Sequence, residues 1–207
     1  MVTSIENYVK GLTTSFHLIS EERKMVLESI GAYIQNKILH SESIQLVYIC
    51  THNSRRSHFG QVWAHVAADY YRIKQLQSFS GGTEATAFHP NAIAALQRIG
   101  FDVQAINNDK NTLYHVFHDH SQRPSICFSK CYDDPSNPQK QFAAIMTCSD
   151  ADENCPFIPG AESRFVTKYN DPKTFDGSPE QDAKYDKRCQ EIARETFYIF
   201  SRFKQTK

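Results

Sequence analysis

Four short apolar stretches along the chain have the length and composition of β-strands. They comprise residues 44–50, 76–80, 142–148 and 163–169. Segments with apolar residues at helical spacing alternate with them and comprise residues 20–38, 57–71, 91–100 and 179–203. Strands that alternate with helices are typical of parallel sheets. The pattern therefore predicts an α/β fold, with a central parallel four-stranded sheet that helices cover on both faces.

Two parts of the chain fall outside this alternation. Residues 1–43 precede the first strand and contain an amphipathic helix with Ser20 as its N-cap. We interpret them as an N-terminal helical extension, followed by a main domain over residues 44–207. Within that domain, the polar segment from about 107 to 140 contains three of the chain's prolines, Pro124, Pro135 and Pro138. We interpret it as an insertion or an extended loop.

Charge and cysteine content narrow the class of protein. Lys plus Arg and Asp plus Glu number 23 each, so the net charge does not indicate nucleic acid as a partner. The absence of a long apolar stretch argues against a leader or a membrane span, and we expect a cytoplasmic protein. In a reducing compartment, cysteines are more often catalytic or metal-binding than paired in disulfides. The six are Cys50, Cys127, Cys131, Cys148, Cys155 and Cys189.

The stretch CTHNSRRS, residues 50–57, places a thiol between a predicted strand and a predicted helix. Backbone N–H groups at such a junction surround a tetrahedral oxyanion and stabilise a thiolate, which makes Cys50 a candidate nucleophile. Arg56 can hold two oxygens of the anion, and Ser57 can donate a hydrogen bond to the sulfur. The expected oxyanion-binding loop comprises Thr51, His52, Asn53, Ser54, Arg55 and Arg56. A buried structural cysteine followed by a basic surface loop would fit the spacing alone equally well.

This stretch resembles the C-T-G-N-x-x-R-S signature of the low-molecular-weight protein tyrosine phosphatase superfamily, which includes the thioredoxin-coupled arsenate reductases. The likeness continues through residues 79–103, FSGGTEATAFHPNAIAALQRIGFDV. It implies that Asn53 and Ser80 organise the anion loop. Two positions depart from the family: His52 replaces its glycine, and Arg55 stands where the reductases often have a further cysteine. Gln61 replaces a carboxylate, so a potassium site is not expected.

A second pair of thiols distinguishes the reductases from the phosphatases. Cys148 and Cys155 flank a polar segment in MTCSDADENCPFIPG, which we expect to be irregular and mobile. The segment resembles the redox segment of the arsenate reductases. The resemblance implies that Cys50 attacks arsenate, that Cys148 then attacks Cys50, and that Cys155 attacks Cys148. Thioredoxin would reduce the final disulfide.

The pair Asp171–Pro172 resembles the Asp-Pro general acid of the superfamily, which protonates the leaving oxygen. The phosphatases usually have an aromatic residue after this pair, whereas this chain has Lys173. Because lysine offers no surface on which a phenol can stack, the substitution favours a small inorganic anion as substrate.

These residues predict an arsenate reductase that acts on an oxyanion, with thioredoxin as external reductant and without a tightly bound cofactor or metal. A phosphatase that uses Cys50, Arg56 and Asp171 on phosphotyrosine or a small phosphoester is the first alternative. A noncatalytic oxyanion or redox sensor is the second. A zinc site is not favoured, because its candidate ligands are loosely spaced: Cys127, Cys131, His115, His118 and His120.

Overall fold

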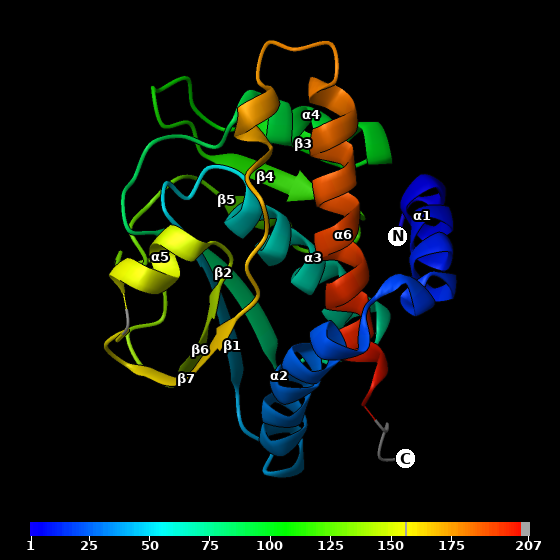
Figure 1. Cartoon of the computed structure of the whole chain (residues 1–207), viewed down its shortest axis with the longest axis vertical. Coiled ribbons are helices and arrows are strands. Elements are labelled where there is room, and N and C mark those ends of the chain that lie inside the picture. The colour runs from blue at the N-terminus through cyan, green and yellow to red at the C-terminus, as the bar shows by residue number, and fades with distance from the viewer. Residues whose placement is uncertain (156, 204–207) are drawn as a thin grey trace.

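The computed structural model describes residues 1–155 and 157–203 and contains the predicted parallel sheet at its centre (Figure 1). Its strands lie in the order β2-β1-β6-β7, and each neighbouring pair is parallel. Their bounds are β1 (Ile44–Cys50), β2 (Leu76–Gly82), β6 (Phe142–Met146) and β7 (Ala161–Val166). The carboxyl ends of all four strands therefore lie at one edge of the sheet, where ligands bind in folds of this kind.

Helices cover both faces of the sheet, as predicted, but unequally. One face packs against α1 (Thr3–Thr14), α2 (Glu21–Leu39), α3 (Arg56–Tyr70) and α6 (Gln181–Ser201). The other face carries the short α5 (Ser149–Asn154), which lies on the opposite side of the sheet from α3 and α6 in Figure 1. The sheet consequently separates a large hydrophobic cluster from a small one.

Strand β1 shows how the sequence serves both clusters. Successive side chains of a strand point to opposite faces, and a strand that is buried on both faces reads as one continuous apolar run. Leu46 and Tyr48 belong to the large cluster, whereas Val47 and Ile49 belong to the small one. The strand ends at Cys50, which is also part of the small cluster.

The N-terminal extension packs into the large cluster. Ile5, Val9 and Leu12 of α1 are buried there, and Tyr8 stacks on the core residue Trp63 with ring centroids 5.6 Å apart. The predicted cap of α2 is present, since Ser20 Oγ accepts a hydrogen bond from the Arg23 amide at 3.2 Å. A 3₁₀ turn, η1 (Phe16–Leu18), joins the two helices. Of the helices in the described residues, none is long and apolar enough to cross a membrane.

The insertion contributes two strands of a second, antiparallel sheet. Strands β4 (Tyr114–Phe117) and β5 (Ser125–Cys127) lie within it and pair with β3 (Asp102–Ala105), which precedes it. Helix α4 (Pro90–Ile99) joins β2 to this sheet and begins at a proline. It ends at Gly100, whose φ of +114° lies in the left-handed region that glycine adopts at low cost.

Candidate active site

The thiol of Cys50 lies at the end of β1, buried against the start of α3. Its sulfur is 3.1 Å from Ser57 Oγ. Asn53 Nδ2 donates a hydrogen bond to the same hydroxyl oxygen at 2.8 Å. Because Ser57 accepts from Asn53, its own hydroxyl hydrogen is available to donate to the Cys50 sulfur. The structure thus brings together Cys50, Ser57 and Asn53 as the sequence predicted, in an arrangement that can stabilise a thiolate.

The backbone of the anion loop makes its turn at Asn53. This residue has a φ of +43°, a left-handed conformation that asparagine tolerates better than most residues. His52 is not among the described non-glycine residues with positive φ, so the substitution of the family's glycine does not strain the loop. Instead, the His52 carbonyl accepts hydrogen bonds from Thr86 Oγ1 at 3.0 Å and from Ser129 Oγ at 2.9 Å.

Residues from the β2–α4 connection hold the loop from one side. The amide of Glu84 donates to the Thr51 carbonyl at 2.8 Å, and Ser54 Oγ donates to the Ala87 carbonyl at 2.7 Å. The amide of His89, the N-cap of α4, donates to the Ser54 carbonyl at 3.0 Å. The loop is therefore fixed by a segment that lies about thirty residues further along the chain.

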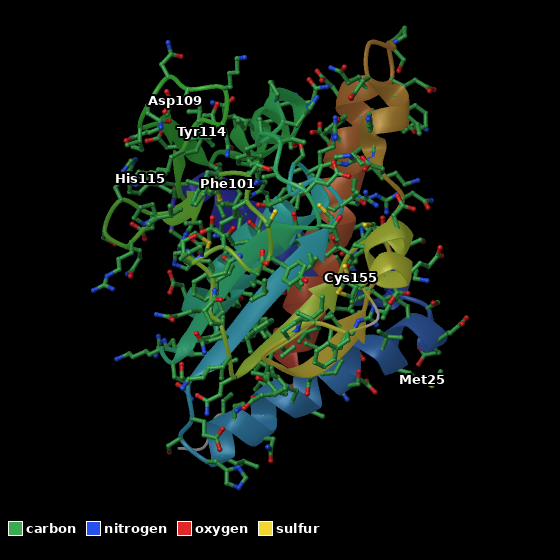
Figure 2. All side chains as sticks on the ribbon, turned by 90° about the vertical axis from the view of Figure 1, so that its left-hand side faces the viewer. Met25, Phe101, Asp109, Tyr114, His115 and Cys155 are labelled. Carbon is green, nitrogen blue, oxygen red and sulfur yellow. The ribbon has the colours of Figure 1, made fainter. Side chains whose placement is uncertain are left out.

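The insertion holds the loop from another side. The Lys130 amide donates to Asn53 Oδ1 at 2.9 Å, and Gly82 and Cys131 form an isolated parallel bridge. Sequence patterns did not predict this role, because Ser129 and Lys130 carry no recognisable motif. Asp109, in the connection between β3 and β4, and His115 of β4 lie far from Cys155 in Figure 2. The contact of the insertion with the anion loop is thus made by its last third.

Arg56 is buried at the first position of α3, and its guanidinium faces the segment before η2 (Pro172–Phe175). One terminal nitrogen donates to the Tyr169 carbonyl at 2.8 Å, and the other donates to Asp171 Oδ2 at 2.5 Å. Arg56 Nε is also buried and has no hydrogen-bond partner in the described residues. The two residues predicted to bind the anion and to act as acid are thus in direct contact.

Asp171 is held in place by its own turn. Its Oδ1 accepts a hydrogen bond from the Lys173 amide at 3.0 Å, which caps the N-terminus of η2. Lys173 itself is exposed. The position of the Asp171 carboxylate is therefore set by this cap on one side and by Arg56 on the other.

The side chain of Arg55 does not face the anion loop, contrary to its predicted place among the oxyanion-binding residues. Its Nε donates to Tyr185 Oη at 2.6 Å, and a terminal nitrogen donates to Asp176 Oδ2 at 3.0 Å. Tyr185 Oη in turn donates to Asp176 Oδ1 at 2.6 Å. Only the backbone of Arg55 can contribute to the loop. Its partners lie more than 120 residues away, so local sequence gave no signal for them.

Cys148 lies next to the anion loop on the neighbouring strand end. Its sulfur is 3.4 Å from Thr51 Oγ1, and the Thr147 amide donates to the Ile49 carbonyl at 2.7 Å. Cys50 and Cys148 are both buried in the small hydrophobic cluster, and the partly buried Cys155 packs against it. Cys155 lies beside α5 in Figure 2. All three thiols are free.

The segment between Cys148 and Cys155 is helical, which corrects the prediction of an irregular segment. It forms α5, with Cys148 as N-cap and Cys155 as C-cap. Ala151 is fully buried, and Asp152 forms ion pairs with Arg164 and with Lys168, the latter at 2.9 Å. These tertiary contacts stabilise a turn of helix whose polar composition does not favour one.

The predicted loop-supporting residue Ser80 contacts α3, the helix that follows the anion loop. Its Oγ lies 3.2 Å from His58 Nδ1, and both residues are fully buried. Burial, aided by the charge of Lys130, lowers the pKa of His58 to about 3, so its ring is neutral. The other residue considered for a potassium site, Gln61, donates to the Ile126 carbonyl at 2.9 Å. Ser80 and Gln61 are thus both engaged in contacts within the protein.

The cysteine and histidine residues considered for zinc do not form one site. In the described part of the chain, the single group of three potential metal ligands consists of His65, Asp69 and His118. Cys127 is buried in the large cluster, and Cys189 is a buried core residue next to Trp63. Sequence reasoning missed the His65–Asp69 pair, although its spacing of four residues on a helix is a signal for adjacent side chains.

Comparison with known proteins finds sequence similarity to arsenate reductases. The chain is 27% identical over 128 residues to arsenate reductase 2 of Staphylococcus epidermidis, a match that covers 61% of this chain and 77% of that protein. It is 24% identical over 148 residues to the arsenate reductase of Bacillus subtilis, covering 72% and 83% of the two chains. No family model matches the chain.

The fold is similar to those of solved low-molecular-weight phosphatases. The phosphotyrosine phosphatase from Vibrio cholerae O395 matches with a TM-score of 0.54 at 13% identity, covering 77% of this chain and 95% of that one. The protein tyrosine phosphatase from T. tengcongensis matches with a TM-score of 0.50 at 15% identity, covering 78% and 100%. The predicted resemblance is thus confirmed for the sequence and for the fold.

Proposed function

We propose that this chain of the low-molecular-weight phosphatase-like superfamily is an arsenate reductase in which Cys50, Cys148 and Cys155 act in sequence. The observation that carries the proposal is the position of Cys148. Its sulfur lies beside Thr51 of the anion loop, in the same hydrophobic cluster as Cys50. Hydrolysis of a phosphoester needs the nucleophile, the anion loop and the acid, but it does not need a second thiol at this place.

The first step is attack of the Cys50 thiolate on the arsenic atom of arsenate. The backbone N–H groups of residues 51–56 and the Arg56 guanidinium stabilise the oxyanion. Arg56 Nε is a buried donor without a partner among the described residues, and it can serve this anion without breaking the contact with Tyr169. Asp171 donates a proton to the departing oxygen, which leaves as water, and an S–As bond joins Cys50 to the arsenic.

The second step reduces the arsenic. The Cys148 thiolate attacks the Cys50 sulfur, the S–As bond breaks, and its electron pair stays on arsenic, which leaves as arsenite. A Cys50–Cys148 disulfide remains. The Cys155 thiolate then attacks the Cys148 sulfur and releases the Cys50 thiolate. A dithiol protein of the thioredoxin type reduces the Cys148–Cys155 disulfide and takes up the oxidising equivalents.

The attack of Cys155 on Cys148 requires α5 to unwind. Cys148 and Cys155 cap its two ends, and seven residues at the helical rise of 1.5 Å separate their Cα atoms by roughly 10 Å. A disulfide requires Cα atoms within about 7 Å of each other. Formation of the final disulfide therefore breaks the helix.

A phosphatase activity on phosphotyrosine or a small phosphoester is the second candidate. It is favoured by the completeness of the set formed by Cys50, Arg56 and Asp171, whose last two members already touch. Both reactions begin with the same thiolate in the same loop. The later thiols distinguish them.

The test measures arsenate-dependent thioredoxin oxidation and aryl phosphate hydrolysis for the wild type and four single variants. Cys50→Ser should lose both activities, while Cys148→Ser and Cys155→Ser should lose only the reductase activity. Cys131→Ser changes a partly buried thiol outside the relay and is the matched control. It should retain the reductase and hydrolase activities of the wild type. If the wild type hydrolyses aryl phosphate but does not reduce arsenate, the reductase proposal is wrong and only the phosphatase proposal remains. Anion binding without either reaction would point to a sensor.

A further inference from the structure

A group of three potential metal ligands lies away from the Cys50 site, at the other end of α3. His65 and Asp69 are one helical turn apart, and His118 directly follows β4 in the insertion. His118 Nε2 lies 2.9 Å from Asp69 Oδ2, and His65 Nε2 lies 3.7 Å from the same oxygen. The three ligand atoms all lie within 4.8 Å of one another. Two imidazole nitrogens and one carboxylate oxygen therefore lie close together.

The spacing fits a small divalent ion. Zinc binds histidine nitrogen and carboxylate oxygen at about 2.0–2.2 Å in tetrahedral geometry, which places neighbouring ligand atoms about 3.3–3.6 Å apart. The two distances to Asp69 Oδ2, 2.9 and 3.7 Å, lie on either side of this range. At 3.7 Å, His65 Nε2 is too far from the carboxylate for a hydrogen bond. His65 Nε2 takes no part in the contact between His118 and Asp69. It is therefore available to an ion bound between the three groups.

A further contact orients one of the ligands. His65 Nδ1 lies 2.8 Å from Ser125 Oγ of β5, so the ring presents Nε2 to Asp69 and His118. Histidine ligands of metals usually hold their second nitrogen in a hydrogen bond of this kind, which fixes the ring and selects the coordinating nitrogen. His118 is only 3% exposed, and it packs edge-on against His65 with ring centroids 5.2 Å apart.

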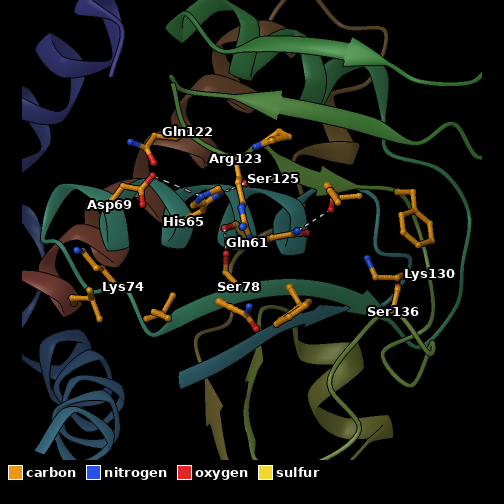
Figure 3. Close-up of a pocket in the computed structure, with 17 residues that line it drawn as sticks. Gln61, His65, Asp69, Lys74, Ser78, Gln122, Arg123, Ser125, Lys130 and Ser136 are labelled. Atoms are coloured by element: carbon orange, nitrogen blue, oxygen red, sulfur yellow. Dashed lines mark hydrogen bonds and ion pairs between the residues drawn. The ribbon is translucent and has the colours of Figure 1, made fainter. Parts of the chain in front are cut away.

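Two of the three residues border a cavity. His65 and Asp69 line a pocket of about 490 Å³, together with Gln122 and Arg123 of the insertion (Figure 3). Figure 3 shows Asp69 and His65 side by side at the end of this pocket, next to Gln122. Solvent in this cavity can therefore reach His65 and Asp69, two of the three candidate ligands.

We propose that His65, Asp69 and His118 form a binding site for a divalent transition metal, with zinc as the ion that the ligand set and spacing fit best. The site joins three parts of the chain. His65 and Asp69 belong to α3, His118 belongs to the insertion, and the Val2 amide donates to the His118 carbonyl at 3.1 Å. A bound ion would fasten the insertion, whose last third supports the anion loop, to the helix that starts at Arg56.

The experiment titrates Co²⁺, a spectroscopic substitute for zinc, into the full-length protein. Two imidazoles and a carboxylate produce visible d–d absorption without the ultraviolet charge-transfer band that cobalt shows with thiolates. One equivalent should saturate the visible signal in the wild type, and Zn²⁺ should displace it. Asp69→Asn and His65→Gln, both at partly exposed side chains, should each weaken Co²⁺ binding at least tenfold. The more exposed His120→Gln is the matched control and should bind as the wild type does.

A thermal unfolding measurement supplies a second readout. Zn²⁺ binds only the folded site, so it should raise the Tm of the wild type and of His120→Gln but not that of Asp69→Asn. Absence of the visible bands in the wild type would overturn the proposal. It would also be overturned by a charge-transfer band in place of the d–d signal, or by a signal that survives both Asp69→Asn and His65→Gln. None of these outcomes depends on arsenate reduction.

Discussion

The anion loop and α5 lie next to each other at the carboxyl edge of the sheet, yet they are held very differently. The loop receives hydrogen bonds from the β2–α4 connection and from the insertion, and its residue Asn53 and the adjoining Ser57 are fully buried. Helix α5 is short, and it is held by Ala151 in the small cluster and by the ion pairs of the partly buried Asp152. One region is fixed from several directions, and the other is tied at two points.

This difference matches the two kinds of chemistry proposed for the regions. An oxyanion site works best when its donors are in place before the anion arrives, because no reorganisation is then needed during the reaction. A thiol that must exchange partners works only if its segment can move. A segment with few buried contacts opens at a lower free-energy cost than one bound on all sides.

The largest effect is expected for a substitution of Arg56, which tests whether the preformed loop needs the planar guanidinium of this residue. Arg56→Lys retains the charge but cannot contact the Tyr169 carbonyl, Asp171 and the anion with one planar group. We expect kcat/KM for arsenate to fall by about 10²–10³-fold, the usual cost of losing an oxyanion donor. Steady-state kinetics with Arg72→Lys, an exposed residue after α3, provides the control. A loss of less than tenfold would mean that the backbone donors suffice.

Asn53 tests the rigidity of the loop itself. Asn53→Ala removes the hydrogen bonds to Ser57 and from the Lys130 amide, and it places a Cβ-bearing residue without a polar side chain at a φ of +43°. We expect the free energy of unfolding in urea to fall by about 2–4 kcal/mol. Asn53→Gly loses the same hydrogen bonds without the backbone strain, so it should be about 1 kcal/mol more stable than Asn53→Ala. Equal stabilities would show that the turn carries no strain.

The pH dependence of stability tests the support behind the loop. Burial lowers the pKa of His58 from 6.5 to about 3, so the folded protein binds fewer protons than the unfolded chain over this interval. The free energy of unfolding therefore has its full value above pH 6.5. It falls progressively as the pH is lowered, by up to about 1.4 kcal/mol per pH unit. Urea unfolding at several pH values should show this slope in the wild type. His58→Gln should lessen it, whereas a substitution at the exposed His40 should not.

The smallest effect on stability is expected in α5. Asp152→Asn weakens the ion pairs with Arg164 and Lys168, which are partly exposed, so the free energy of unfolding should fall by less than about 1 kcal/mol. Because α5 would then unwind more readily, thioredoxin-coupled turnover should rise up to about fivefold, while aryl phosphate hydrolysis stays unchanged. Asp150→Asn, at an exposed position of the same helix, is the control. A lower turnover in Asp152→Asn would show that intact α5 promotes the exchange.

Much of the site could be predicted from local sequence. The strand that ends at Cys50, the helix that starts at Arg56 and the cap of α4 at His89 follow from periodicity and from residue types with fixed conformational preferences. The contact of Arg56 with Asp171 and the nearness of Cys148 to the loop agree with roles that the motifs implied. These features depend on short stretches of chain placed at the ends of parallel strands.

Tertiary structure alone decided the remaining features. It turned the Arg55 side chain toward Tyr185 and Asp176, folded the polar segment after Cys148 into α5, and set the end of the insertion against Asn53. It also brought His118 to the His65–Asp69 pair. Each depends on partners far apart in the chain, and local periodicity does not specify which of them meet. A sequence determines which chemical groups are present and which elements carry them, whereas the packing of those elements determines which groups meet.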